Sequence, residues 1–216
     1  LLVQNHEYTD DALLFPDGLA NWSTAKTRKS LAAHGVSVIE VKKVHTRRGG
    51  NAWRVVRPSR YARRIPGYTP MRMGGPAKDD PRLKTSDDPT GRRVLGTLNN
   101  CAMGYTPWGT YLACEENFNG YFRKPSAAAT PPVPRTALEQ RYGITATGFG
   151  YLWGTTDKRF NVDLEPNEPN RFGWVVEINP FEPKSTPVKH TALGRFKHEG
   201  AWVQEARDGR VVVYSG

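Results

Sequence analysis

The stretch Asn99–Asn117, NNCAMGYTPWGTYLACEEN, is the part of the sequence from which the fold and the site are best predicted. It contains a thiol, Cys101, then a Thr-Pro-Trp-Gly-Thr corner, a short apolar strand and two adjacent carboxylates, Glu115 and Glu116. A corner and a strand that end in acidic residues are typical of a β-rich scaffold that presents metal ligands at one end of a sheet. We therefore expect a ligand site where this strand ends.

Two further stretches place a carboxylate beside a histidine. Asn5-His6-Glu7-Tyr8 lies near the start of the chain and Lys197-His198-Glu199-Gly200 near its end. Imidazole with carboxylate suits transition metals, whereas carboxylates with backbone carbonyls suit calcium. Taken alone, each pair has a structural interpretation as well as a metal-binding one. Together with the central stretch, we expect them to converge on one site.

The paired residues of the central stretch leave alternatives open. Adjacent side chains of a strand point to opposite faces, so one of Glu115 and Glu116 is expected to turn inward and the other toward solvent. Cys114, in the apolar run Tyr-Leu-Ala-Cys, is predicted to be a small buried side chain. Cys101 lies in a predicted turn, where a plain thiol and a metal ligand are equally good interpretations. The spacing of the two cysteines is not that of a zinc site.

The composition predicts a globular, sheet-rich protein with many turns. The 216 residues include 21 glycines, 17 prolines, six tryptophans and nine tyrosines, and the net charge is +10. Such a charge favours anionic partners through long-range attraction. Nucleic-acid binding is supported only by charge and aromatic content, so no nucleic-acid partner is expected. No membrane-spanning run, nucleotide-binding glycine pattern, HExxH zinc motif or GxSxG nucleophile motif is present.

Hydrophobic patterns predict many short strands and one clear helix. The helix covers Asn21–His34 and ends at Gly35. Residues 59–91 and 118–172 are predicted to be loop-rich insertions, with a second short helix near Thr136–Tyr142. The predicted strands are Leu1–Tyr8, Val36–Val44, Ala52–Arg57, Arg92–Leu98, Gly109–Cys114, Phe172–Ile178, Thr186–Thr191, Gly200–Gln204 and Arg210–Ser215.

This pattern is typical of a sandwich, barrel or propeller, although no clean repeat is present. The sequence begins and ends within apolar strands, Leu1-Leu2-Val3 and Val211-Val212-Val213. We therefore expect residues 1–216 to be part of one domain of a longer protein, truncated at both ends.

Six blocks of the sequence, spread over nearly the whole chain, together resemble the PhoX-type alkaline phosphatase family. The blocks are Asn5–Tyr8 (NHEY), Gly96–Ala102 (GTLNNCA), Thr106–Thr110 (TPWGT), Cys114–Asn117 (CEEN), Gly173–Ile178 (GWVVEI) and Thr191–Ala201 (TALGRFKHEGA). They occur in the order of the family, and this combination is far more specific than any one block.

The resemblance implies a β-propeller-like phosphatase that hydrolyses phosphate monoesters and binds Fe(3+) and Ca(2+). The cysteine that follows the Asn-Asn pair is an iron ligand in the family, which implies that role for Cys101. The carboxylate ligands of the family fall on the CEEN and HEG blocks, which implies Glu116 and Glu199, with Glu115 as a further candidate. Glu7 is the fourth carboxylate candidate, because its block also ends a strand. Catalytic and substrate-binding residues are not identified.

The family is exported, commonly by a twin-arginine signal, which implies a periplasmic or extracellular protein. Its partners would be small phosphate esters. Two alternatives remain: a non-catalytic propeller that binds an anionic polymer, and a calcium-dependent lactonase on a similar propeller. The thiol of the Asn-Asn-Cys block argues against the lactonase. A polymer-binding protein would be sensitive to salt and indifferent to a chelator.

Overall fold

The computed structural model describes all residues, 1–216, and is mainly β. Thirteen strands form four sheets, together with three α-helices and seven short 3-10 helices. The prediction of a mainly β protein is confirmed, with three α-helices in place of one or two. No helix combines the length and the apolar character needed to cross a membrane.

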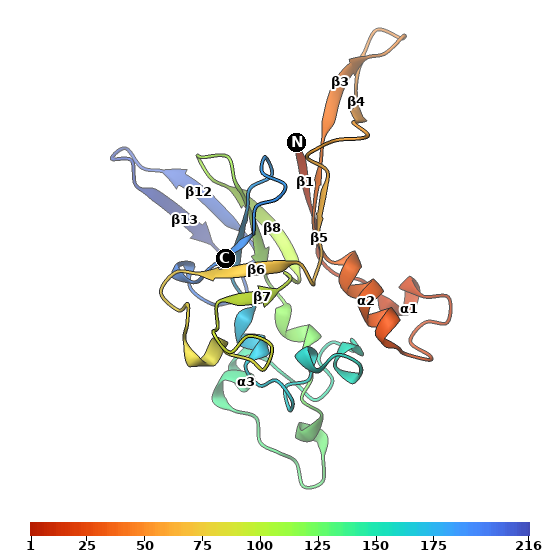
Figure 1. Ribbon diagram of the computed structural model, residues 1–216, viewed down its shortest axis with the longest axis vertical. Helices are drawn as coiled ribbons and strands as arrows, with labels where there is room; N and C mark the ends of the chain where they lie inside the picture. The colour runs from red at the N-terminus through yellow and green to blue at the C-terminus, as the bar shows by residue number, and fades with distance from the viewer.

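A six-stranded sheet lies in the middle of the molecule (Figure 1) and has the strand order β7-β6-β11-β10-β9-β8. Its strands are β6 (Pro70–Gly74), β7 (Arg93–Leu95), β8 (Asn100–Tyr105), β9 (Tyr111–Glu115), β10 (Val175–Ile178) and β11 (Val188–His190). Neighbours pair antiparallel except β6 and β11, which are parallel. The Thr106–Thr110 corner is the turn between β8 and β9, closed by a hydrogen bond of 2.9 Å from the Thr106 amide to the Thr110 carbonyl.

Three smaller sheets complete the fold, two beside the central sheet and one projecting beyond it (Figure 1). The first consists of β1 (Leu2–His6), β2 (Gly35–Ile39) and β5 (Arg63–Ile65), with β2 in the middle. The other two are the hairpins β3–β4 (Val41–His45 and Asn51–Val55) and β12–β13 (Ala201–Glu205 and Val211–Ser215). Both chain-terminal strands therefore pair within the chain, β1 with β2 and β13 with β12.

The longest helix is α2 (Thr24–Ala33), and its ends follow capping rules. The Ser23 side chain accepts a hydrogen bond from the Lys26 amide, and Gly35, with φ of +96°, turns the chain directly into β2. The remaining α-helices are α1 (Asp11–Leu14) and α3 (Ala137–Tyr142). The 3-10 helices are η1 (Pro81–Leu83), η2 (Phe118–Tyr121), η3 (Pro125–Ala128), η4 (Trp153–Thr155), η5 (Lys158–Phe160), η6 (Glu168–Arg171) and η7 (Thr191–Leu193).

Two strand predictions need correction. The predicted strand Val36–Val44 is broken at Glu40, because β2 is paired on both sides within the body whereas β3 pairs only with β4. Residues 59–91, predicted to be irregular, contain β5 and β6. Pro70 and Gly74, the end residues of β6, are unusual in strands and concealed it in the sequence. The side chains of Met71 and Met73 nevertheless point into the core at alternate positions, as in a half-buried strand.

The segment 118–172 is irregular, as predicted, yet it supplies much of the core. Its buried aromatic residues are Phe118, Tyr121, Phe122, Trp153, Phe160 and Phe172. They pack in one cluster with inward-facing residues of the central sheet, such as Tyr111 and Val176. Its longest continuously exposed stretch is 128–134. Burial of these rings holds an irregular backbone in place where sheet hydrogen bonds are few.

Candidate metal centre

The site lies where the ends of β1, β8 and β9 meet, and a β-bulge shapes it. Asn100 pairs with Glu115 and Met103 with Ala113, so two residues of β8, Cys101 and Ala102, face one residue of β9. An extra residue in one strand bends that strand and redirects a side chain. Cys101 therefore lies in a strand, at its bulge, and the prediction of a turn at this position was wrong.

Asn5 attaches the end of β1 to this bulge. Its side-chain amide Nδ2 donates hydrogen bonds to the carbonyls of Cys101, at 3.0 Å, and Ala102, at 3.1 Å. Its Oδ1 accepts a hydrogen bond of 3.0 Å from the Tyr111 hydroxyl of β9. One side chain thus joins three strands, and Glu7, two residues further on, is held beside Cys101.

Asn99 places Glu116 in the same way from the other side. Its carbonyl accepts a hydrogen bond of 3.0 Å from the Glu116 amide, and its Oδ1 accepts one of 2.7 Å from the Asn117 amide. Asn99 has a φ of +50°, a left-handed conformation that asparagine tolerates better than most residues. This conformation lets both backbone and side chain of Asn99 reach the end of β9.

The result is a close group of three ligand-type side chains. A carboxylate oxygen of Glu7, the Sγ of Cys101 and a carboxylate oxygen of Glu116 all lie within 4.8 Å of one another, and each residue is partly buried. Of the five candidates from the sequence, these three are brought together. A thiolate with two carboxylates is a donor set that suits a transition metal ion, and carboxylates alone also suit calcium.

The clustered acidic groups repel one another, which favours the binding of a cation. Burial, together with the charges of Glu116 and Glu199, raises the pKa of Glu7 above its usual range. Burial, followed by the charges of Glu7 and Glu116, raises the pKa of the Cys101 thiol to about 11. None of the ion pairs in the structure involves Glu7 or Glu116. A bound metal ion would relieve this repulsion and favour the thiolate.

Glu199 lies next to the group but outside it. Its carbonyl accepts a hydrogen bond of 2.8 Å from the Ala102 amide, so the backbone at Glu199 is attached to the bulge. Its side chain is exposed, and its charge contributes to the raised pKa values of Glu7 and Cys101. The expected convergence of the three sequence stretches is therefore seen, with Glu199 at the rim.

Glu115 points away from the group and is engaged elsewhere. Its side chain is fully buried and forms an ion pair of 2.7 Å with the equally buried Lys189. Its other oxygen accepts hydrogen bonds from the amides of Gly173, at 3.0 Å, and Trp174, at 3.2 Å. Burial lowers the pKa of Lys189 to about 8, against the opposing effect of Glu115. We therefore remove Glu115 from the set of ligand candidates.

The two histidines and the second cysteine also have structural roles. His6 Nε2 lies 2.7 Å from the Ser37 hydroxyl, and His198 Nδ1 lies 2.7 Å from the Ser215 hydroxyl. Cys114 is fully buried in the small cluster with Leu112 and Val175, as predicted for a small apolar side chain. The thiol at position 101 is thus the one that faces the carboxylates.

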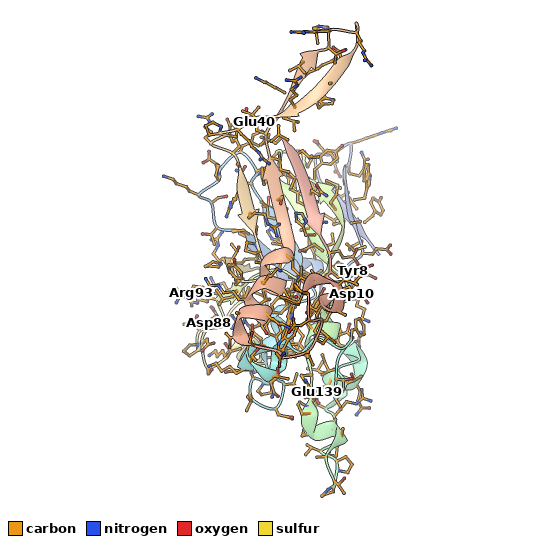
Figure 2. All side chains as sticks on the ribbon, turned by 90° about the vertical axis from the view of Figure 1, so that its right-hand side faces the viewer. Tyr8, Asp10, Glu40, Asp88, Arg93 and Glu139 are labelled. Carbon is orange, nitrogen blue, oxygen red and sulfur yellow. The ribbon has the colours of Figure 1, made fainter.

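A cavity of about 540 Å³ opens beside the group. Glu7, Asn99 and Asn117 line it on the side of the metal centre, and the aromatic rings of Tyr8, Tyr121, Phe149 and Tyr151 also line it. Figure 2 labels two of its lining residues, Tyr8 and Asp10, which follow β1 in the chain. The ionisable side chains of the lining are acidic or tyrosyl, so the cavity itself does not attract a phosphate group.

The positioning residues of the site were not identified from the sequence. Besides Asn5 and Asn99, Tyr121 takes part: its hydroxyl lies 3.2 Å from the Glu7 carbonyl, 3.3 Å from Asn99 Nδ2 and 3.1 Å from His34 Nε2. Asn5 and Asn99 lie within the sequence blocks NHEY and GTLNNCA, so the sequence drew attention to both positions. Tyr121 gave none, because it lies in the segment predicted to be a loop.

The sequence and the fold of this chain are similar to those of known proteins. A family model described as alkaline phosphatase PhoX matches residues 1–216. None of the curated proteins compared with the chain matches it. A solved structure described as Pseudomonas fluorescens PhoX in complex with vanadate, a transition state analogue, is similar with a TM-score of 0.91 and 49% sequence identity. The similarity covers 99% of this chain and 35% of that one, so this chain spans about a third of that protein. The chain belongs to the alkaline phosphatase PhoX family.

Proposed function

We propose that this chain is part of a metal-dependent phosphatase that hydrolyses phosphate monoesters and releases inorganic phosphate. The observation that carries the proposal is the convergence of Glu7, Cys101 and Glu116 within 4.8 Å in a chain of the PhoX family. The similar solved structure supports it, because vanadate bound there as a transition state analogue indicates phosphoryl-transfer chemistry in that protein.

The metals proposed are Fe(3+) and Ca(2+). Cys101 with Glu7 and Glu116 would hold iron, and the exposed Glu199 at the rim is a candidate for a calcium ligand. When bound, such ions offset the negative charge that develops on the phosphoryl oxygens. The part of this chain would be to fix the ligands: Asn5 holds the β1 end and Asn99 the β9 end.

The cavity beside the ligands would accept the alcohol part of the ester. Its aromatic and acidic lining suits an uncharged or cationic group better than a phosphate. We therefore propose that the phosphate is bound at the metals and the leaving alcohol lies toward Tyr8 and Phe149. The net charge of +10 would attract anionic esters to the molecule.

The remaining expectations from the resemblance also stay proposals. We propose that the open sheets seen here belong to a β-propeller-like domain of a longer protein, and that further ligands come from its other parts. The share of 35% of the similar structure supports a longer protein. Export to the periplasm or the cell exterior is proposed on the resemblance alone.

The matched pair Cys101→Ala and Cys114→Ala tests the metal centre. Both remove one thiol, but only Cys101 faces Glu7 and Glu116. Protein purified without chelator is analysed by elemental mass spectrometry, and hydrolysis of a phosphate monoester is measured on the same samples. We expect Cys101→Ala to lose iron and activity together and Cys114→Ala to keep both.

Two results would contradict the proposal. An active Cys101→Ala variant with its full iron content would remove Cys101 from the ligand set. A well-folded native protein with neither iron nor calcium, and no phosphatase activity, would favour the alternative of a non-catalytic protein that binds an anionic polymer.

A further inference from the structure

The β3–β4 hairpin stands clear of the rest of the molecule. It projects beyond the body in Figure 1, and Figure 2 shows its side chains extending outward on both sides above Glu40. Its two strands pair only with each other. The β1–β2 register places His6 opposite Gly35 and Leu2 opposite Ile39, so the hairpin starts at the end of this pair that is remote from Glu7. It is therefore separate from the candidate metal centre.

The hairpin concentrates the positive charge of the chain. Residues 41–60 contain seven lysines and arginines and no aspartate or glutamate, in a protein whose net charge is +10. None of these seven side chains takes part in an ion pair. A charge of this density without carboxylate partners is available to an external anion.

One face of the hairpin places like charges directly opposite each other. Lys42 of β3 pairs with Arg54 of β4 in the antiparallel register, and both side chains are exposed. Opposed like charges destabilise a strand pair, and here no acidic side chain lies between them. Arg47 and Arg48 extend the positive surface into the turn. An anionic surface in contact with this face would relieve the repulsion.

The other face combines a cation with apolar side chains. Lys43 pairs with Trp53, and Val41 pairs with Val55, so these four residues share one face. Trp53 is 68% exposed and Val55 49% exposed. An indole ring with this exposure, on a hairpin that projects from the body, contributes little to the packing of the fold. Tryptophan beside lysine and arginine is typical of segments that lie in the interface of a lipid bilayer.

We propose that the β3–β4 hairpin docks the protein onto an anionic phospholipid surface. Lys42, Arg54, Arg47 and Arg48 contact the lipid phosphates, and Trp53 with Val41 and Val55 enters the interfacial layer. Nucleic acid would satisfy the charges as well, but it offers no apolar phase for the two valines. A hairpin that enters the headgroup layer edge-on has lipid on both sides, so phosphates contact the Lys42–Arg54 face while the apolar side of the interface contacts the Trp53 face.

The test is vesicle cosedimentation of the full chain. Vesicles of phosphatidylcholine with phosphatidylglycerol are compared with vesicles of phosphatidylcholine alone, each at low and high salt. Each basic side chain at an anionic membrane contributes about fivefold to partitioning, so Lys42→Gln with Arg54→Gln should weaken binding about 25-fold. The matched control is Lys184→Gln with Arg207→Gln, an exposed lysine and arginine outside the hairpin, which should retain most of the binding.

A second measurement uses the indole itself. The tryptophan emission should shift to shorter wavelength on binding to anionic vesicles, and Trp53→Phe should remove most of that shift. Equal losses in the two double variants would overturn the proposal, because net charge rather than the hairpin would then control binding. So would equal binding to neutral and anionic vesicles. Absence of vesicle binding together with hairpin-dependent binding of a single-stranded oligonucleotide would replace the lipid with nucleic acid.

Discussion

Glu115 and Glu116 are neighbours in sequence with opposite surroundings, and the matched variants Glu115→Gln and Glu116→Gln should separate their roles. Glu115 is fully buried against Lys189, at 2.7 Å, and accepts amide hydrogen bonds from Gly173 and Trp174. Glu116 is partly buried, forms no ion pair and faces Cys101. The same chemical change therefore removes a charge from two very different environments.

We expect Glu115→Gln to lower the free energy of unfolding by about 3–5 kcal/mol, the usual cost of removing one partner from a buried ion pair. Lys189 would be left with no exposed surface and without its Glu115 partner, so it must either carry an unpaired buried charge or release its proton, and both cost free energy. For a total stability of about 5–15 kcal/mol this is a large fraction. Glu116→Gln should change the same quantity by less than about 1 kcal/mol, because it leaves no charge buried without a partner.

The assay is guanidinium unfolding followed by tryptophan fluorescence, with metal content measured on the folded samples. Glu116→Gln is expected to lose metal at nearly unchanged stability, and Glu115→Gln the reverse. If Glu115→Gln does not fold, the double variant Glu115→Gln with Lys189→Met should recover the fold, since the glutamine oxygen can still accept from the Gly173 and Trp174 amides and no buried charge is left without a partner. The reasoning is refuted if Glu115→Gln costs less than about 1 kcal/mol or the two single variants are equally destabilised.

Three further predictions concern stability and positioning. Burial lowers the pKa of His34 to about 4, so the unfolded chain binds more protons than the folded chain between about pH 6.5 and 4. The free energy of unfolding should therefore fall by about 3 kcal/mol as the pH decreases through this window. In denaturant unfolding, His34→Gln should remove that part of the pH dependence. Gly104 of β8 lies directly against Ala201 of β12. Gly104→Ala would place a Cβ 1.7 Å from the Ala201 carbonyl oxygen, so β12 should move away from β8. Faster amide exchange in the β12–β13 hairpin would confirm this, and unchanged exchange would contradict it. Asn99→Gly keeps the positive φ but removes the side-chain acceptor for the Asn117 amide. The metal affinity, measured by titration, should therefore fall about tenfold. An unchanged affinity would show that the backbone alone places Glu116.

Local patterns in the sequence predicted several elements correctly. The β8–β9 corner, the helix around Ser23–His34 and the strands β7 and β10 to β13 lie within a few residues of their predicted positions. Each depends on interactions between near neighbours, such as a capping serine, a glycine with positive φ or an apolar run. Pairing partners were different: β6 joins the central sheet next to β11, more than a hundred residues away, and nothing in the sequence of either strand indicates this.

The sequence by itself determined which residue types are available to the site: two cysteines, two adjacent glutamates and two His-Glu pairs. The tertiary structure decided which of them meet. A single extra residue in β8 turns Cys101 toward Glu7 and Glu116, while Cys114 faces the core. Alternation along β9 sends Glu115 to Lys189 and leaves Glu116 at the site. Two adjacent glutamates are chemically equivalent until one face of the strand is buried. Which of them becomes the ligand therefore depends on strand register and on a partner that lies far away in the chain.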